Sequence, residues 1–255
     1  MLKIKFLGIY FSFVCLYLFN SCGLDTYYVL NRPTDIYHEP SIPDTGQDSE
    51  YSQSYFDFRT NDDNELGGDF KYIGTLVYYK IYNNYSDMNN HISVVSNISN
   101  NTNSSEAFPK LESYGYKQLV AKSSSGRAER LTIEPSGSGQ RIYIRLTNYK
   151  EYFTAKIVIG AGDNGTVLEG STEYEPLRYE GNKNFDFGRK NSKGDYDKPE
   201  STDSDVYYSS TASEENIYYV TLYAVAAGQD SSLTTYYSNV LYLGSVKINA
   251  SVEDN

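Results

Sequence analysis

The sequence contains no tryptophan and, in 255 residues, only two cysteines, two histidines and seven prolines. Both cysteines, Cys15 and Cys22, lie near the N-terminus, so the rest of the chain has no thiol for a disulfide or a zinc site. Histidine and cysteine are the side chains on which metal binding and nucleophilic catalysis most often depend. We therefore expect no metal, no cofactor and a fold that rests on its hydrophobic core.

Positive charge is also scarce, because 22 lysines and arginines stand against 33 aspartates and glutamates, a net charge of −11. Affinity for a phosphate backbone depends on clustered basic side chains, so the composition predicts no nucleic-acid binding. The same shortage argues against attachment to anionic lipid through a polybasic patch. Any attachment to a membrane would need an inserted segment or a covalent anchor.

The N-terminal apolar run is too short to span a bilayer. It covers Phe6–Phe19, 14 residues, whereas a spanning helix needs about 20. It follows a short basic start that contains Lys3 and Lys5. A basic start before such a run is typical of a secretory signal peptide.

The run ends in Leu18-Phe19-Asn20-Ser21-Cys22-Gly23, which resembles the lipoprotein box of bacteria, in the relaxed form of spirochaetes. Phe19 and Asn20 stand where leucine and a small residue are usual. The resemblance implies that residues 1–21 are removed and that the Cys22 thiol carries diacylglycerol, with several acyl chains giving a stable anchor. Removal leaves 20 basic and 33 acidic side chains, a net charge of −13. An ordinary cleaved signal and an uncleaved N-terminal membrane helix are the alternatives.

Composition divides the rest of the chain into a tether and a domain. Residues 22–50 contain Pro33, Pro40 and Pro43 among small polar residues, which predicts a lipidated flexible tether in which Tyr27–Leu30 could add an edge strand. Residues 51–251 form the predicted domain, as one sandwich or two. Residues 182–204 are rich in Asp, Lys, Gly and Ser and predict a mobile insertion.

The domain has the pattern of a β protein, with 28 tyrosines and 11 phenylalanines that favour a pleated surface. Apolar residues alternate with polar ones in several runs, the period expected when one face of a strand is buried. The alternating runs are Ile142–Thr147, Phe153–Ile159, Tyr218–Ala224 and Val240–Ile248. Two further strand-like runs, Tyr55–Phe58 and Phe70–Tyr82, are rich in aromatic and β-branched residues. Only Tyr85–Ser96 and Ser113–Lys122 are candidate helices. The sequence predicts an all-β, antiparallel β-sandwich with minor helix.

The C-terminal part resembles a fibronectin type III or immunoglobulin-like module. Tyr219–Ala226 is similar to its penultimate strand, Gly228–Thr235 to the hairpin loop and Ser238–Tyr242 to the last strand. The resemblance implies that Gly74–Tyr82 is the central strand of the opposing sheet. About 130 residues separate these pieces, which indicates an elaborated sandwich.

One motif could carry chemistry, but it has a simpler structural explanation. Gly160–Gly165 matches the G-x-G-x-x-G pattern of dinucleotide sites, yet Gly170 and Pro176 interrupt the helix that should follow. Asn164-Gly165 instead predicts a type I′ hairpin to Val167-Leu168. The histidines, His38 and His91, are not accompanied by a G-x-S-x-G nucleophile elbow.

Carboxylates are the other candidate catalytic or ligating groups. Glu173, Glu175 and Glu180 lie near Tyr174 and Tyr179, which would suit glycoside hydrolysis. Two further acidic groups lack the spacing of a calcium loop, and we expect both to be solvated loops. They are Asp62, Asp63, Glu65 and Asp69, and Asp195, Asp197, Asp203 and Asp205.

Tyrosine doublets are the remaining signal of function. They occur at Tyr78-Tyr79, Tyr207-Tyr208, Tyr218-Tyr219 and Tyr236-Tyr237. Each places one ring on either face of a strand, so some rings should lie outside a single core and provide recognition surface. We expect a non-enzymatic lipoprotein on the outer membrane, cell surface or periplasmic face, held through Cys22, that binds a protein or glycan. The alternatives are a structural subunit of an envelope assembly and a glycan-active enzyme.

Overall fold

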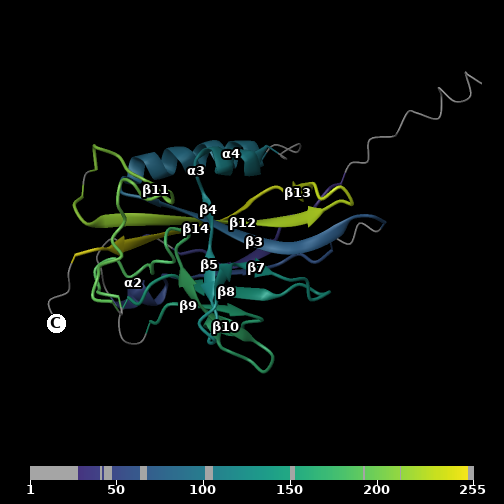
Figure 1. Cartoon of the computed structure of the whole chain (residues 1–255), viewed down its shortest axis with the longest axis horizontal. Coiled ribbons are helices and arrows are strands. Elements are labelled where there is room, and N and C mark those ends of the chain that lie inside the picture. Colours follow the sequence, from purple (N-terminus) through teal and green to yellow (C-terminus); the bar gives the residue numbers. More distant parts are fainter. Residues whose placement is uncertain are drawn as a thin grey trace, which may run out of the picture.

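The computed structural model describes residues 28–40, 42, 48–63, 68–100, 106–149, 153–191, 193–212 and 214–251. Two seven-stranded sheets pack face to face, and two helices cover the far side of one of them (Figure 1). All strand pairs are antiparallel except one short parallel pair. The predicted all-β sandwich with minor helix is confirmed. Cys22 and the predicted signal lie outside the described residues.

Sheet A curls into a half-barrel. In spatial order its strands are β1 (Thr34–His38), β2 (Phe56–Arg59), β8 (Arg141–Arg145), β9 (Lys156–Ile159), β10 (Thr172–Leu177), β5 (Val120–Lys122) and β6 (Ala128–Arg130). The short helix α2 (Asp48–Ser52) precedes β2.

Sheet B is built around two long strands, β3 (Lys71–Tyr82) and β12 (Ile217–Gln229), which pair along most of their length. The other strands are β4 (Lys117–Gln118), β7 (Thr132–Ile133), β11 (Val206–Tyr207), β13 (Thr235–Tyr237) and β14 (Leu241–Asn249). The chain passes between the sheets twice, from β4 to β5 through Leu119 and from β6 to β7 through Leu131. The Leu119 amide donates to the Val77 carbonyl at 2.8 Å, and the Leu131 amide donates to the Leu119 carbonyl at 2.7 Å.

The two sheets enclose an inner core that is mainly aliphatic and phenylalanine. Phe56, Phe58 and Ile144 from sheet A face Val220 and Leu222 from sheet B, and all five are fully buried. Alternation explains the contribution of sheet A, because its inward residues occupy every second position along β2 and β8.

The opposite face of sheet B is buried as well, beneath α3 (Tyr85–Ser99) and α4 (Ala107–Ser113) (Figure 1). The helices supply Met88, Val95 and Leu111 to this outer core. Because both faces of β3 and β12 are covered, these strands are near-continuous apolar runs. The predicted helix Tyr85–Ser96 is confirmed, and its start is explained by the Asn84 side chain, which accepts from the amides of residues 86 and 87 at 2.9 and 3.2 Å.

Three local predictions are wrong. The region predicted as helix Ser113–Lys122 contains the end of α4 and then β4 and β5. Described residues 28–33 form no strand; the edge strand is β1, a few residues later. Gly74–Tyr82 does not lie in the sheet opposite Tyr219–Ala226 but pairs with it directly inside sheet B.

The predicted hairpin after β9 exists, but with a longer loop. Asn164 and Gly165 both have positive φ, 54° and 73°, as a type I′ turn requires, and the Thr166 amide donates to the Asp163 carbonyl at 3.2 Å. The turn, η1 (Asp163–Gly165), lies at the tip of the loop, and β9 pairs with β10 rather than with Val167-Leu168. A Cβ at residue 165 would lie 2.6 Å from the Tyr143 ring, so this glycine is required by packing as well as by φ.

Candidate binding groove

A groove lies between the first turns of α3 and the outer face of β14 and β12, with a volume of about 550 Å³. Sites for small molecules usually span roughly 300–1,000 Å³. We call it the tyrosine groove, and its lining residues are Pro40, Ile42, Tyr85, Met88, Asn89, Glu214, Tyr219, Tyr242, Ser245 and Lys247.

Three tyrosines give the groove its walls and floor. Tyr85 is 46% exposed and packs against Tyr219, with ring centroids 5.3 Å apart. Helical spacing places Tyr85, Met88 and Asn89 on one face of α3, where Met88 is buried and the other two reach the groove. Tyr242 forms the β14 side. The groove is therefore held by a helix and two strands rather than by mobile loops alone.

A chain of hydroxyl groups runs along the β14 side. The Ser245 Oγ atom lies 2.9 Å from Thr221 Oγ1 and 3.1 Å from the Tyr242 hydroxyl. Desolvation raises the pKa of Tyr242 and of Tyr219, with Glu214 adding to the effect at Tyr219. These phenols are therefore neutral near pH 7 and can both donate and accept hydrogen bonds.

Charge in the tyrosine groove is nearly balanced. The Lys247 ammonium lies 3.3 Å from the Glu214 carboxylate, and both side chains are partly exposed. Glu39 is close enough that its charge adds to the raised pKa of Tyr242. The single lysine is therefore already matched by carboxylates.

A second cleft, which we call the half-barrel cleft, lies at the β5–β6 end of sheet A, near the passage from β6 to β7, with a volume of about 590 Å³. Its walls are less aromatic and carry charged residues of both signs. The lining residues are Ala121, Ser123, Arg127, Glu129, Arg130, Leu131, Thr132, Glu134, Gln140, Ile159, Thr172 and Tyr174. Arg127 pairs with Glu129, and Arg130 donates to the Tyr179 hydroxyl at 3.2 Å.

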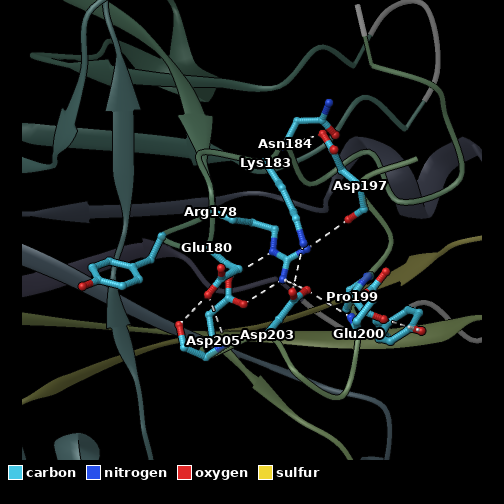
Figure 2. Close-up of polar contacts among 12 residues, drawn as sticks. Arg178, Glu180, Lys183, Asn184, Asp197, Pro199, Glu200, Asp203 and Asp205 are labelled. Atoms are coloured by element: carbon cyan, nitrogen blue, oxygen red, sulfur yellow. Dashed lines mark hydrogen bonds and ion pairs between the residues drawn. The ribbon is translucent and has the colours of Figure 1, made fainter. Parts of the chain in front are cut away.

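The acidic segment before β11 forms a buried ion network around Arg178 (Figure 2). The Arg178 guanidinium binds both carboxylate oxygens of Asp205, at 3.0 and 2.7 Å, and one of Asp203, at 2.6 Å. It also donates to the Asp197 carbonyl at 3.0 Å. Figure 2 shows the guanidinium pointing into the loop that these residues form. A bidentate, fully buried arrangement of this kind holds the segments that contribute its residues in one fixed geometry.

The network connects the predicted insertion, residues 182–204, to the inner core. The Tyr79 hydroxyl donates to Asp205 at 2.5 Å and accepts from the Tyr179 amide at 2.6 Å. Burial opposes ionisation of Asp203, but hydrogen bonds from Arg178 and Lys183 hold its pKa below the usual range. Phe185 and Phe187, in the segment predicted to be mobile, are buried in the same core. The mobility of the other turns of residues 182–204 stays a prediction.

The prediction of solvated acidic loops is wrong for part of each group. Asp63, Asp69 and Asp195 are exposed, as predicted, and Glu65 lies outside the described residues. Asp197, Asp203 and Asp205 are buried in the network. Asp62 is also buried, and one of its carboxylate oxygens accepts from the amides of residues 136, 137 and 139 at 2.7 to 3.1 Å. These buried carboxylates stabilise the loops by accepting hydrogen bonds. A sequence pattern does not distinguish this role from solvation.

The three glutamates considered for glycoside hydrolysis form no shared site. Glu173 and Glu175 line a shallow depression of about 320 Å³ on β10, where Glu175 pairs with Lys122 at 2.8 Å. Glu180 instead accepts from the Ser204 hydroxyl at 2.8 Å. Tyr179 lies between two cations, Lys117 and Arg130, at 5.4 and 5.2 Å from its ring centroid.

Both histidines pack against tyrosine. His38 stacks on Tyr55 at a centroid distance of 4.0 Å, and His91 stacks on Tyr114 at 3.8 Å. Desolvation lowers the pKa of His91. Among the described residues, no group of three or more His, Cys, Asp or Glu side chains is placed to hold a metal ion.

The tyrosine doublets straddle sheet B, but most of their outward rings lie in the outer core. Tyr79 and Tyr218 point into the inner core, whereas Tyr78, Tyr219 and Tyr237 pack beneath the helices. Tyr207 and Tyr208 are exposed, at 38% and 51%. As expected, the tyrosine rings do not all fit in one core, but most of the outward rings are buried in the outer core instead of being exposed. The tyrosine groove opens at the margin of this outer core.

Sequence reasoning missed Asn89, Glu214 and Lys247 as groove residues. The spacing of Tyr85 and Asn89, four apart in a predicted helix, was an available signal, as was the polar Lys247 between two buried β14 residues. Glu214 precedes β12 in a turn, and only the tertiary structure brings it to Lys247.

No family model matches the chain, and neither a curated protein nor a solved structure matches it. In the part of the chain that the structure describes, no helix is both long and apolar enough to cross a membrane.

Proposed function

We propose that this chain is an exported bacterial lipoprotein, anchored at the cell envelope through Cys22, that binds a ligand without catalysing a reaction. The observation that carries the binding role is the tyrosine groove, because it is open, preformed and lined by rigid aromatic rings beside polar groups. Such a combination is typical of small-molecule and recognition sites.

The anchor is supported by the sequence alone. The basic start, the short apolar run and the pattern before Cys22 favour lipidation of that thiol. A mature chain of net charge −13 gains no attraction from anionic lipid, whereas buried acyl chains contribute about 0.8 kcal/mol per methylene.

Lipidation is tested by growing cells with labelled palmitate. We expect the chain to incorporate label and to partition into detergent. Cys22→Ser should abolish labelling, and the variant should either retain the unprocessed signal or become soluble after other cleavage. Cys15→Ser is the matched control and should label normally, because Cys15 lies in the segment that we expect to be removed. Full labelling of Cys22→Ser would overturn the anchor.

The binding role is tested separately, with the purified full chain on glycan and peptide arrays and in pull-downs. We expect saturable binding that Tyr85→Ala weakens. Binding that is unchanged in Tyr85→Ala, or stable self-assembly without any ligand, would favour the structural-subunit alternative.

A further inference from the structure

We infer that the tyrosine groove binds an uncharged saccharide. The inference rests on the proposed function and specifies the ligand class of that site. It depends on three properties of the lining: exposed aromatic surface, amphoteric hydrogen-bonding groups, and charges that are already matched.

The aromatic surface suits a sugar ring. Tyr85 presents nearly half of its surface to solvent while its contact with Tyr219 holds the ring in place. A pyranose has faces made of C–H groups, which pack on the electron-rich face of an aromatic ring. Tyrosine has few rotatable bonds, so little conformational entropy is lost when the ligand is bound.

The hydrogen-bonding groups match sugar hydroxyls, which both donate and accept. Tyr242 and Ser245 provide connected hydroxyls along one wall, where Ser245 also bonds to the fully buried Thr221. Across the groove, the half-buried Asn89 side chain has no hydrogen-bond partner among the described residues. Its amide offers two donors and one acceptor oxygen. A polar ligand in the groove would give the Asn89 amide a partner and would use the remaining hydrogen-bonding capacity of Tyr242 and Ser245.

The charges disfavour an acidic ligand. Among the described residues that line the groove, Lys247 is the one cation, and Glu214 lies 3.3 Å from it. Glu39 adds a further negative charge near Tyr242. An anion such as a uronate, sialic acid or phosphate would lose water and gain no unmatched cation, which is unfavourable. A purely apolar ligand would leave the Asn89 amide unpaired.

The half-barrel cleft provides an internal comparison. It has a similar volume but a single tyrosine, Tyr174, and several charged side chains along its rim. We therefore assign the saccharide to the tyrosine groove and use Tyr174→Ala as a control of similar chemistry at the other cavity.

The test is calorimetric titration of the full chain, in a detergent without a sugar headgroup. The probes are neutral trisaccharides of glucose and of N-acetylglucosamine, and a trisaccharide that carries a uronate. We expect at least one neutral probe to saturate the protein and the uronate to bind at least about 10-fold more weakly. Tyr85→Ala should weaken binding about 10-fold, and Asn89→Leu about 5-fold through its lost amide.

Tyr174→Ala and the exposed Tyr208→Ala should leave affinity unchanged, and circular dichroism with thermal melting confirms that each variant is folded. Failure of every neutral probe to bind, tighter binding of the uronate, or dependence on Tyr174 instead of Tyr85 would overturn the inference. Tyr85-dependent binding of a peptide with no saccharide binding would overturn the ligand class alone. The palmitate experiment reports on the anchor independently of either result.

Discussion

The two faces of sheet B are both buried, but by different chemistry. The inner face meets another sheet through aliphatic and phenylalanine side chains and ends in the Arg178 network. The outer face meets two helices through tyrosines whose hydroxyls bond to one another and to His91. The polar groups of the inner layer gather in the Arg178 network, whereas the outer layer has the tyrosine groove at its margin. Both faces contribute to the core, and the outer face also borders the candidate groove.

The largest expected effect concerns the ion network at the inner face. Arg178→Met would leave Asp205 buried without its cation and Asp203 with Lys183 alone, so we expect the free energy of unfolding to fall by about 3–5 kcal/mol. Urea denaturation measures the loss. Lys122→Met, which breaks the exposed pair with Glu175, is the control and should cost below about 1 kcal/mol. Similar small losses in both variants would show that the network does not stabilise the fold.

We expect the outer core to unfold together with the inner core. Leu222→Ala opens a cavity at the inner face and Leu111→Ala opens one beneath α4; both leucines are fully buried. We expect each to lose about 2–5 kcal/mol in a single cooperative transition. A loss confined to Leu222→Ala, or a separate early transition of the helices, would show that the outer core is not part of the cooperative unit.

A smaller effect distinguishes satisfied from unsatisfied hydroxyls of the outer core. The Tyr223 hydroxyl is buried and has no partner among the described residues, whereas that of Tyr82 lies within 3.1 Å of both Tyr116 and His91. Tyr223→Phe should therefore raise the free energy of unfolding by about 1 kcal/mol, and Tyr82→Phe should lower it by about 1 kcal/mol. Thermal melts of the two variants provide the comparison, and equal shifts would contradict it.

The smallest effect is a pH dependence from Lys80, whose outer-face ammonium donates to the Gly115 and Ser204 carbonyls. Desolvation lowers the pKa of Lys80 from 10.5 to about 8. Between these values the unfolded chain binds more protons than the folded one, so stability from this group rises with pH.

We expect the free energy of unfolding of the unmodified chain to rise, relative to Lys80→Met, by at most about 1 kcal/mol between pH 8 and 9. Lys71→Met, at an exposed lysine, should follow the unmodified chain. The window stops below pH 10 because buried tyrosines with raised pKa, such as Tyr82, act in the opposite direction there. A flat difference between the unmodified chain and Lys80→Met would remove Lys80 as its source.

Alternation and composition were sufficient to predict much of the architecture. The strands around Ile142–Thr147 and Tyr218–Ala224 and the helix from Tyr85 follow from local periodicity, which depends on neighbours a few residues apart. The helix predicted at Ser113–Lys122 was wrong because this segment passes between the two sheets, and pairing with β3 and β10 outweighs its weak helical preference. The central strand was assigned to the wrong sheet because alternation identifies strands without identifying their partners.

The candidate site was less predictable than the fold. Tyr85, Tyr219 and Tyr242 were visible as aromatic residues, but their convergence depends on the packing of α3 against β12 and β14. The acidic cluster from Asp195 to Asp205 looked solvated because sequence does not show that Arg178, about 20 residues earlier, points into it.

By itself the sequence determined the strand-rich class, the aromatic excess, the negative charge and the signal-like N-terminus, because each is a property of composition or of short-range periodicity. Only the tertiary structure decided that both faces of sheet B are buried, that an acidic loop closes around a buried arginine, and that three tyrosines from a helix and two strands border one groove. These features bring together residues from distant parts of the chain, and the physical preferences that join them, burial and hydrogen-bond satisfaction, act in space and not along the sequence.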